Sequence, residues 1–184
     1  MKVIVAITAA SGAIYARQLL EMLIASDEVK QIAVVYSTNA RQVAEYEGVT
    51  MPASEKIKEY DNSNMFSAIA SGSAGWNAMV VVPSSVGTIG RVASGVSQTL
   101  IERACDVMLK ERRKLIFVVR ETPYSLIHLR NMTTLTETGA IILPATPSFY
   151  SHPDNIESLC RTVTERIVSL LEITSARYEW GKEE

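Results

Sequence analysis

The chain has 184 residues, a length typical of one globular domain, and 47% of them are hydrophobic, which is enough for a substantial core. Its formal net charge of −2 provides no overall field that would attract nucleic acid or an anionic membrane surface. The sequence shows no charged leader before an apolar segment and no apolar run long enough to span a bilayer, so we expect a cytoplasmic protein.

Five short apolar runs recur along the chain, and each is bounded by polar residues, glycine or proline. They do not alternate with polar residues, which is typical of strands that are covered on both faces. The expected strands are VIVAI (3–7), IAVVY (32–36), AMVVV (78–82), LIFVV (115–119) and AIIL (140–143).

Helical patterns lie between these runs, at residues 13–25, 97–113 and 155–171. The apolar faces of the second and third helices are Ile101, Ala104, Cys105 and Met108, and Ile156, Leu159, Cys160, Val163, Ile167 and Leu170. Strands that alternate with helices predict an α/β protein with a parallel sheet wrapped on both sides.

No repeat, linker or low-complexity segment interrupts the chain, so we expect residues 1–184 to form a single domain. The two cysteines, Cys105 and Cys160, lack metal-ligand spacing and fall in helical patterns, which predicts that both lie in the core. The tail after Arg177, YEWGKEE, is expected either to be mobile or to pack on a neighbour.

Parallel sheets of this kind bind ligands at the carboxyl ends of their strands, so each segment after an apolar run is a candidate site. After the first run, the small residues of TAASGA would let backbone N–H groups approach an anion or a planar ring, with a helix N-terminus that favours phosphate. Ser11 adds a hydroxyl. Ala9 and Ala10 stand where a dinucleotide fingerprint has glycine, which disfavours NAD. Close packing of the helix on the sheet is the alternative explanation.

The segment after the third run, PSSVGTIGRVASG, supplies hydroxyls and backbone donors just before a helical run. Ser84, Ser85, Gly87 and Thr88 would suit a phosphate cradle, although the lysine of a P-loop is missing, which disfavours ATP. An ordinary turn rich in serine and glycine is the alternative.

Four basic residues are candidates for binding an anion. Arg103 and Lys110 share a helical face opposite the apolar stripe, where a solvated charged face is the ordinary explanation. Arg120 ends a buried strand, where a charge needs a partner or a ligand. Arg166 borders the apolar stripe of the last helix, where its stem could simply cover apolar surface.

Other polar residues stand near the strand ends. Tyr150 follows the fifth run and is either a core aromatic or a phenol aimed into the cleft, while Glu47 and Glu121 are the carboxylates at strand exits. His128 and His152 show no pattern for a catalytic triad or a metal site, and we expect a structural role for His128.

Five segments in this order resemble the UbiX-type flavin prenyltransferases, relatives of the flavin-containing cysteine decarboxylases. They are ITAASGAIYARQLL, SGS (71–73), PSSVGTIGRVASG, LIERACDVMLKERRKLIFVVRETPYSLIHLRNM and GAIILPATPSFYSHPDNIESL. The resemblance covers nearly the whole chain, and the long middle segment and PATPSFY are its specific parts.

The resemblance implies a Rossmann-like, flavodoxin-like subunit, a three-layer sandwich that assembles into trimers and commonly into dodecamers, with active sites at subunit junctions. Such enzymes join the dimethylallyl group of dimethylallyl monophosphate to reduced FMN without a metal. They attach it at a ring nitrogen and close a fourth ring on the adjacent aromatic carbon. The prenylated FMN then serves a UbiD-type decarboxylase.

Site residues follow from the resemblance by matching positions. The FMN-contacting residues would be Ala9, Ala10, Ser11, Ser37, Ser85, Val86, Gly87, Thr88 and Arg120. The prenyl phosphate would be held by Lys110, Tyr150 and Arg166, with Arg103 contributing across the subunit junction, and Glu47 and Glu121 would handle protons and aid phosphate departure. Three positions depart from the family pattern: Ala9 replaces a glycine, Ser84 replaces a cysteine, and Met65 or Phe66 stands for an aromatic before SGS.

The sequence is also compatible with two other functions. The first is oxidative decarboxylation of a substrate that contains cysteine, although the Pro-x-Met-Asn-x-x-Met-Trp-like segment and the catalytic histidine of that branch are missing. The second is a non-catalytic FMN-binding subunit of a decarboxylase, which would not need the basic set with Tyr150.

Overall fold

In the computed structural model, which describes residues 1–174, six strands form one sheet in the order β3-β2-β1-β4-β5-β6. Every neighbouring pair is parallel. The strands are β1 (Lys2–Ile7), β2 (Gln31–Tyr36), β3 (Ile57–Tyr60), β4 (Ala78–Ser84), β5 (Lys114–Val119) and β6 (Ile141–Pro144). The strand order reverses between β1 and β4, which is the point at which such sheets bind ligands.

The five predicted strands are confirmed, with ends that differ by one or two residues. The sixth strand, β3, was not predicted. It pairs with β2 at the edge of the sheet, and its central residues Lys58 and Glu59 are exposed. An edge strand with charged side chains does not produce the apolar run by which the others were found.

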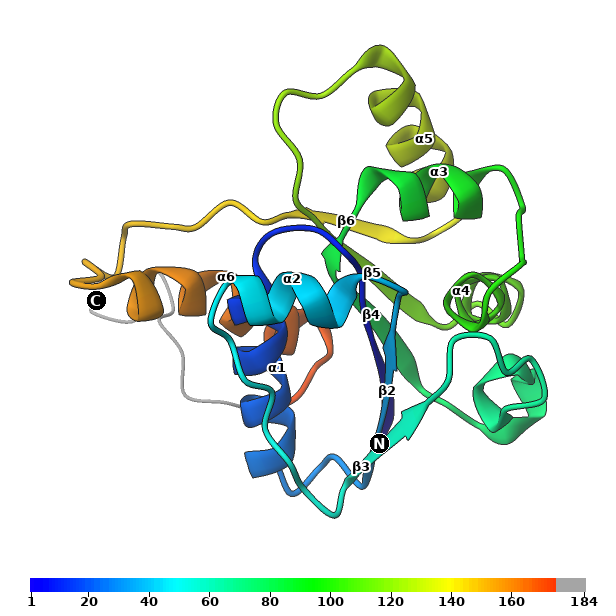
Figure 1. Ribbon diagram of the computed structural model, residues 1–184, viewed down its shortest axis with the longest axis horizontal. Coiled ribbons are helices and arrows are strands. Elements are labelled where there is room, and N and C mark those ends of the chain that lie inside the picture. Colours follow the sequence, from blue (N-terminus) through cyan, green and yellow to red (C-terminus); the bar gives the residue numbers. More distant parts are fainter. Residues whose placement is uncertain (175–184) are drawn as a thin grey trace.

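Six α-helices and two short 3₁₀ turns complete the described chain. The helices are α1 (Ala13–Ala25), α2 (Ala40–Tyr46), α3 (Val86–Ala93), α4 (Leu100–Lys110), α5 (Leu126–Glu137) and α6 (Ile156–Leu170), and the turns are η1 (Ala68–Ala70) and η2 (Gly72–Ala74). Helices α1 and α6 pack against one face of the sheet, and α3, α4 and α5 against the other (Figure 1). This arrangement confirms the predicted three-layer α/β sandwich. No helix within residues 1–174 has the length and apolar character needed to cross a membrane.

The predicted helix at residues 13–25 is confirmed with the same bounds, whereas the other two are shorter than predicted. Helix α4 begins at Leu100 because Thr99 and Glu102 form a capping box. Its predicted apolar face is buried, and both cysteines are buried as expected. Ile156 is 74% exposed, so its predicted place in the core is wrong. It is the first residue of α6, one turn before Cys160, where the buried part of that helix begins.

Helix α5 was not predicted because only Met132 and Leu135 of its twelve residues are buried, which leaves no broad apolar stripe to find. Its N-terminus is a capping box in which the Ser125 N–H donates to Nδ1 of His128 at 3.2 Å. The structural role expected for His128 is therefore confirmed. The tail after Arg177 lies outside the described residues.

Candidate functional site

The carboxyl ends of β1, β2 and β4 are tied together by hydrogen bonds. The buried Thr8, directly after β1, donates its hydroxyl to the carbonyl of Pro83 at 2.8 Å and accepts from the N–H of Ser85 at 2.8 Å. The N–H of Ser37, directly after β2, donates to the carbonyl of Ile7 at 2.9 Å. These bonds bring the predicted residues Ser37 and Ser85 together at the carboxyl ends of the strands.

The segments that follow β5 and β6 lie at this same end of the sheet. The N–H of Arg120 donates to the carbonyl of Ser84 at 3.2 Å, and that of Ala145 donates to the carbonyl of Val119 at 2.8 Å. Glu121 is half-buried beside Arg120, and its carboxylate accepts from the N–H of Thr122 at 3.0 Å. All five predicted exit segments therefore meet at one end of the sheet, as its parallel order requires.

The loop between β1 and α1 turns on Gly12, whose φ of 108° lies in the left-handed region that favours glycine. A side chain at this position would also place its Cβ 2.9 Å from the ring of Tyr15. The N–H groups of Gly12 and Ala13 both donate to the carboxylate of Glu47, at 2.9 and 2.8 Å. Glu47 thus occupies the helix N-terminus at which we expected a phosphate.

The carboxylate of Glu47 is held in its ionised form. Burial by itself would raise the pKa of Glu47, but hydrogen bonds from the side chain of Ser11 and from the N–H groups of Gly12 and Ala13, together with the charge of Arg120, lower it below its usual value. Glu47 is therefore an acceptor of hydrogen bonds at neutral pH, and it balances the guanidinium of Arg120.

A cavity of about 330 Å³ opens beside this pair. Its lining consists of Ser11, Gly12, Ile14, Tyr15, Glu47, Arg120, Ala145 and Cys160. Burial raises the pKa of Tyr15 to about 12, with a further increase from the neighbouring Cys160, so its phenol is neutral. The structure therefore brings the predicted Ser11, Glu47 and Arg120 around one cavity.

Tyr15 and Cys160 also line this cavity, although the sequence did not identify them as site residues. Both belong to apolar helical stripes, and that pattern is typical of core residues whether or not they also face a cavity. Thr8 was missed as well. A polar residue directly after a buried strand was the signal that could have found it.

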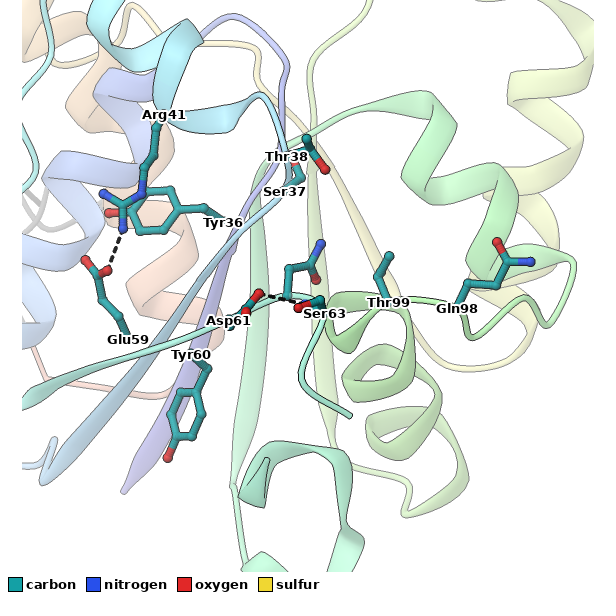
Figure 2. A pocket seen from close by; sticks show the side chains of 11 residues that line it. Tyr36, Ser37, Thr38, Arg41, Glu59, Tyr60, Asp61, Ser63, Gln98 and Thr99 are labelled. Atoms are coloured by element: carbon teal, nitrogen blue, oxygen red, sulfur yellow. Dashed lines mark hydrogen bonds and ion pairs between the residues drawn. The ribbon is translucent and has the colours of Figure 1, made fainter. Parts of the chain in front are cut away.

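A second cavity, of about 680 Å³, lies at the ends of β2 and β3 and beside the start of α4 (Figure 2). Hydroxyl and amide groups dominate the lining, which includes the predicted Ser37 together with Thr38, Asn62, Ser63, Gln98 and Thr99. The guanidinium of Arg41 stacks on the ring of Tyr36 at 3.8 Å and bonds to Glu59 at 2.5 Å, which forms one wall. This polar lining was missed largely because β3 was missed.

The predicted residues Ser85, Val86, Gly87 and Thr88 form the beginning of α3. Ser85 is the N-cap, and its hydroxyl accepts from the N–H of Thr88 at 3.3 Å. Val86 and Gly87 carry the first N–H groups of the helix, for which a helix has no carbonyl of its own. Ser84, at the end of β4, has a buried hydroxyl without a hydrogen-bond partner among the described residues.

The residues predicted to hold the prenyl phosphate do not all meet within one chain. Arg166, on α6, lines a third cavity of about 280 Å³, and Tyr150 lies in the segment that leads from β6 to α6. Lys110 is the last residue of α4 and pairs with Glu111 at 2.6 Å. Because it comes just before the start of β5, it lies near the amino end of that strand, whereas Arg120 follows its carboxyl end. Arg103 bonds to Asp106 at 2.6 Å and to the carbonyl of Ala70 at 3.1 Å.

Met65 and Phe66, one of which stands for the aromatic residue before SGS, lie on the surface of the single chain. Phe66 is fully exposed and Met65 is partly exposed, directly before η1. Ala9, by contrast, is an exposed residue of the β1–α1 loop and stands next to Ala10 and Ser11, as the loop assignment requires.

Comparison with known proteins gives the chain's relatives. Residues 1–174 match the family model described as Flavoprotein. The chain is 42% identical to the flavin prenyltransferase UbiX of Methanocaldococcus jannaschii over 185 residues, covering 98% of this chain and 99% of that protein. The structure of a dodecameric FMN-dependent UbiX-like decarboxylase from Escherichia coli O157:H7 superposes with a TM-score of 0.90 at 33% identity, over 98% of this chain and 100% of that chain. AnUbiX (PadA1), solved in complex with FMN and dimethylallyl pyrophosphate, has a TM-score of 0.86 at 34% identity, over 97% and 98% of the two chains.

Proposed function

Because the chain belongs to the flavoprotein family and, within it, to the UbiX-type flavin prenyltransferases, we propose that it joins the dimethylallyl group of dimethylallyl monophosphate to reduced FMN. The observation that carries this proposal is the placement of Ser11, Glu47 and Arg120 around one cavity at the carboxyl edge of the sheet. We further propose that the prenylated FMN is passed to a UbiD-type decarboxylase.

The donor groups at the sheet edge fit FMN. The hydroxyls of Ser37 and Thr38 line the larger cavity, whose polar walls suit the ribityl chain. The N–H groups at the start of α3 suit the phosphate of FMN, as expected for this loop. The guanidinium of Arg120 suits the polar edge of the flavin ring, and the small residues Ala9 and Ala10 would let the ring lie close to the backbone. When bound, the reduced flavin supplies the ring nitrogen and the adjacent ring carbon that receive the dimethylallyl group.

The basic residues are assigned to the phosphate of the donor. Departure of this phosphate concentrates negative charge on its oxygens, and the guanidinium of Arg166 would stabilise that charge as it develops. The phenol of Tyr150 would donate a hydrogen bond to the departing oxygen. Holding both reactants in one site also removes an entropic cost of up to about 7–11 kcal/mol.

The carboxylates are assigned to proton handling. Closure of the fourth ring releases a proton from an aromatic carbon, and Glu47, Glu121 or the departed phosphate would accept it. Glu47 is well placed because it is ionised, borders the cavity beside Arg120 and contacts Ser11. Its lowered pKa makes it a weak base, so a transfer to Glu47 would need the phosphate or Glu121 to take the proton onward.

We propose a homo-oligomer built from trimers, with a dodecamer as the complete assembly. A neighbouring subunit would then bring Lys110 and Arg103 to a site that a single chain leaves without them. Large apolar side chains that are exposed on the single chain, among them Phe66, Leu126, Ile127, Phe149 and Ile156, support such contacts. The similar protein from Escherichia coli is described as dodecameric.

We propose that residues 1–184 act as one flavoprotein domain. We also propose a cytoplasmic location, in which the free thiols of Cys105 and Cys160 would stay reduced.

Mass spectrometry of the flavin tests the proposed function. The protein is incubated anaerobically with reduced FMN and dimethylallyl monophosphate, and we expect the flavin mass to increase by one five-carbon unit. A parallel reaction with the diphosphate identifies the preferred donor. A protein that binds FMN but leaves its mass unchanged would instead be a flavin-binding subunit, and release of carbon dioxide from a peptide ending in cysteine would indicate the decarboxylase.

A further inference from the structure

The cavity beside Arg166 has two walls from different elements. One wall is the segment between β6 and α6, which contributes Thr146, Ser148 and Ser151. The other wall is α6, which contributes Thr162 and Arg166. The width of this cavity therefore depends on how the segment is held against the helix.

A hydrogen bond joins these walls. The N–H of Ser148 donates to Oγ1 of Thr162 at 3.0 Å, and the Thr162 hydroxyl donates to the carbonyl of Leu159 at 2.8 Å. Because its hydrogen is directed to the helix backbone, the Thr162 oxygen presents its lone pairs to the segment. The N–H groups of Thr146 and His152, in contrast, bond to carbonyls only two and three residues away, at Pro144 and Phe149.

Two threonines of α5 bond only within their own helix and reach no distant segment. In α5, Thr133 and Thr134 donate to the carbonyls four residues earlier, at Leu129 and Arg130. Such bonds inside a helix are common for threonine. The bond that Thr162 accepts from a residue fourteen positions away is the additional feature.

The tether lies close to two residues of the proposed phosphate site. Thr162 precedes Arg166 by four residues and so shares its helical face, and Ser148 precedes Tyr150 by two residues. We propose that Thr162 is a positioning residue, which sets the spacing between Tyr150 and Arg166 and thereby the grip on the phosphate of the prenyl donor. This inference rests on the proposed function.

Two substitutions test the tether in the full chain. Thr162→Val keeps the shape of the side chain but removes the hydroxyl, whereas Thr162→Ser keeps the hydroxyl. We expect Thr162→Val to raise the KM for dimethylallyl monophosphate by about three- to tenfold, the effect of losing one neutral hydrogen bond, with FMN affinity unchanged. Thr162→Ser should restore a KM within about twofold of the parent protein.

Thr134→Val is the matched control, because it removes a helical threonine hydroxyl that bonds only to its own helix. We expect its KM for the donor to equal that of the parent protein. The proposal is overturned if Thr162→Val leaves this KM unchanged, if it weakens FMN binding to the same extent, or if Thr162→Ser behaves like Thr162→Val.

Hydrogen exchange separates this inference from the proposed function, since it needs no turnover. Residues 146–152 should exchange faster in Thr162→Val than in Thr162→Ser, while Thr134→Val should leave their exchange unchanged. If the parent protein forms no prenylated flavin, the proposed function fails, and the exchange data still report on the tether. Equal exchange in both Thr162 variants would show that no tether exists.

Discussion

The two sides of the proposed site differ in how completely one chain builds them. Around Ser11 and Arg120, short loops and the hydrogen bonds of Glu47 fix a small cavity within a single subunit. Around Arg166, one chain supplies a partly open cavity, while Lys110 lies near the amino ends of the strands, at the opposite end of the sheet. Under the proposed function, the fold of one chain would form the flavin side, whereas the phosphate side would depend on residues that a neighbouring subunit brings.

Arg166→Ala should have the largest effect, on the rate of prenyl transfer, and it tests whether the two sides of the site are separate. Loss of a cation from the departing phosphate should lower the rate of prenyl transfer by about 10²–10³-fold. FMN affinity, measured by fluorescence titration, should stay within about twofold, because the flavin side is built from other elements. Arg161→Ala is the control, since Arg161 is an exposed residue of the same helix that pairs with Glu165. A loss of FMN binding that matches the loss of transfer would contradict the division into two sides.

Lys110→Ala should lower transfer by about 10–10²-fold if a neighbour's lysine completes the phosphate side. The sharper test is to dissociate the Lys110→Ala and Arg166→Ala proteins, mix them and reassemble them. A site shared between subunits would recover about one quarter of the parent activity, because some junctions would combine the intact residue of each variant. Mixing that recovers no activity would mean that each site takes Lys110 and Arg166 from the same chain.

Glu47→Gln should affect the flavin side through the beginning of α1. The variant removes a negative charge from a helix N-terminus and from the neighbourhood of Arg120, which should lower the free energy of unfolding by about 1 kcal/mol. Urea unfolding measures this change. Glu45→Gln, at an exposed position of α2 two residues before Glu47, should leave the stability within a few tenths of a kcal/mol. If both variants unfold alike, Glu47 does not hold the loop.

The smallest expected effect is on the stability of the fold at acidic pH. It concerns Glu102, which lies where the connection from α3 enters α4. Burial alone would raise the pKa of Glu102, but the hydrogen bond from Arg91, the N–H groups of Gln98 and Thr99 and the charge of Arg91 lower it. A lowered pKa stabilises the fold above the pKa of the unfolded chain, and this stability is lost as the pH falls below about 4.

The contribution of Glu102 should be about 1 kcal/mol or less, because Arg91 is half-exposed. Thermal unfolding from pH 6 to pH 3 should therefore show a shallower loss of stability for Glu102→Gln than for the parent protein. An unchanged pH dependence in Glu102→Gln would remove Glu102 from the acid response.

The edge of the sheet at which the site lies could be predicted from five apolar runs. In a parallel sheet the carboxyl ends of the strands must share one edge, so Ser37, Ser85 and Arg120 had to approach one another. The edge strand β3 and helix α5 could not be predicted in the same way, because each buries too few side chains to leave a periodic pattern. The polar cavity beside β3 was lost with that strand.

The chain's sequence by itself determined the α/β class, the order of the buried elements, the loops at the strand ends and the resemblance on which the family assignment began. These follow from the period of apolar residues and from residue types at fixed spacing, which are local properties. Only the tertiary structure decided three contacts. The N–H groups of Gly12 and Ala13 donate to Glu47, Tyr15 and Cys160 line the same cavity as Glu47, and Ser148 donates to Thr162. Each of these contacts joins residues from different elements, and the distance between such residues is fixed by packing rather than by sequence separation.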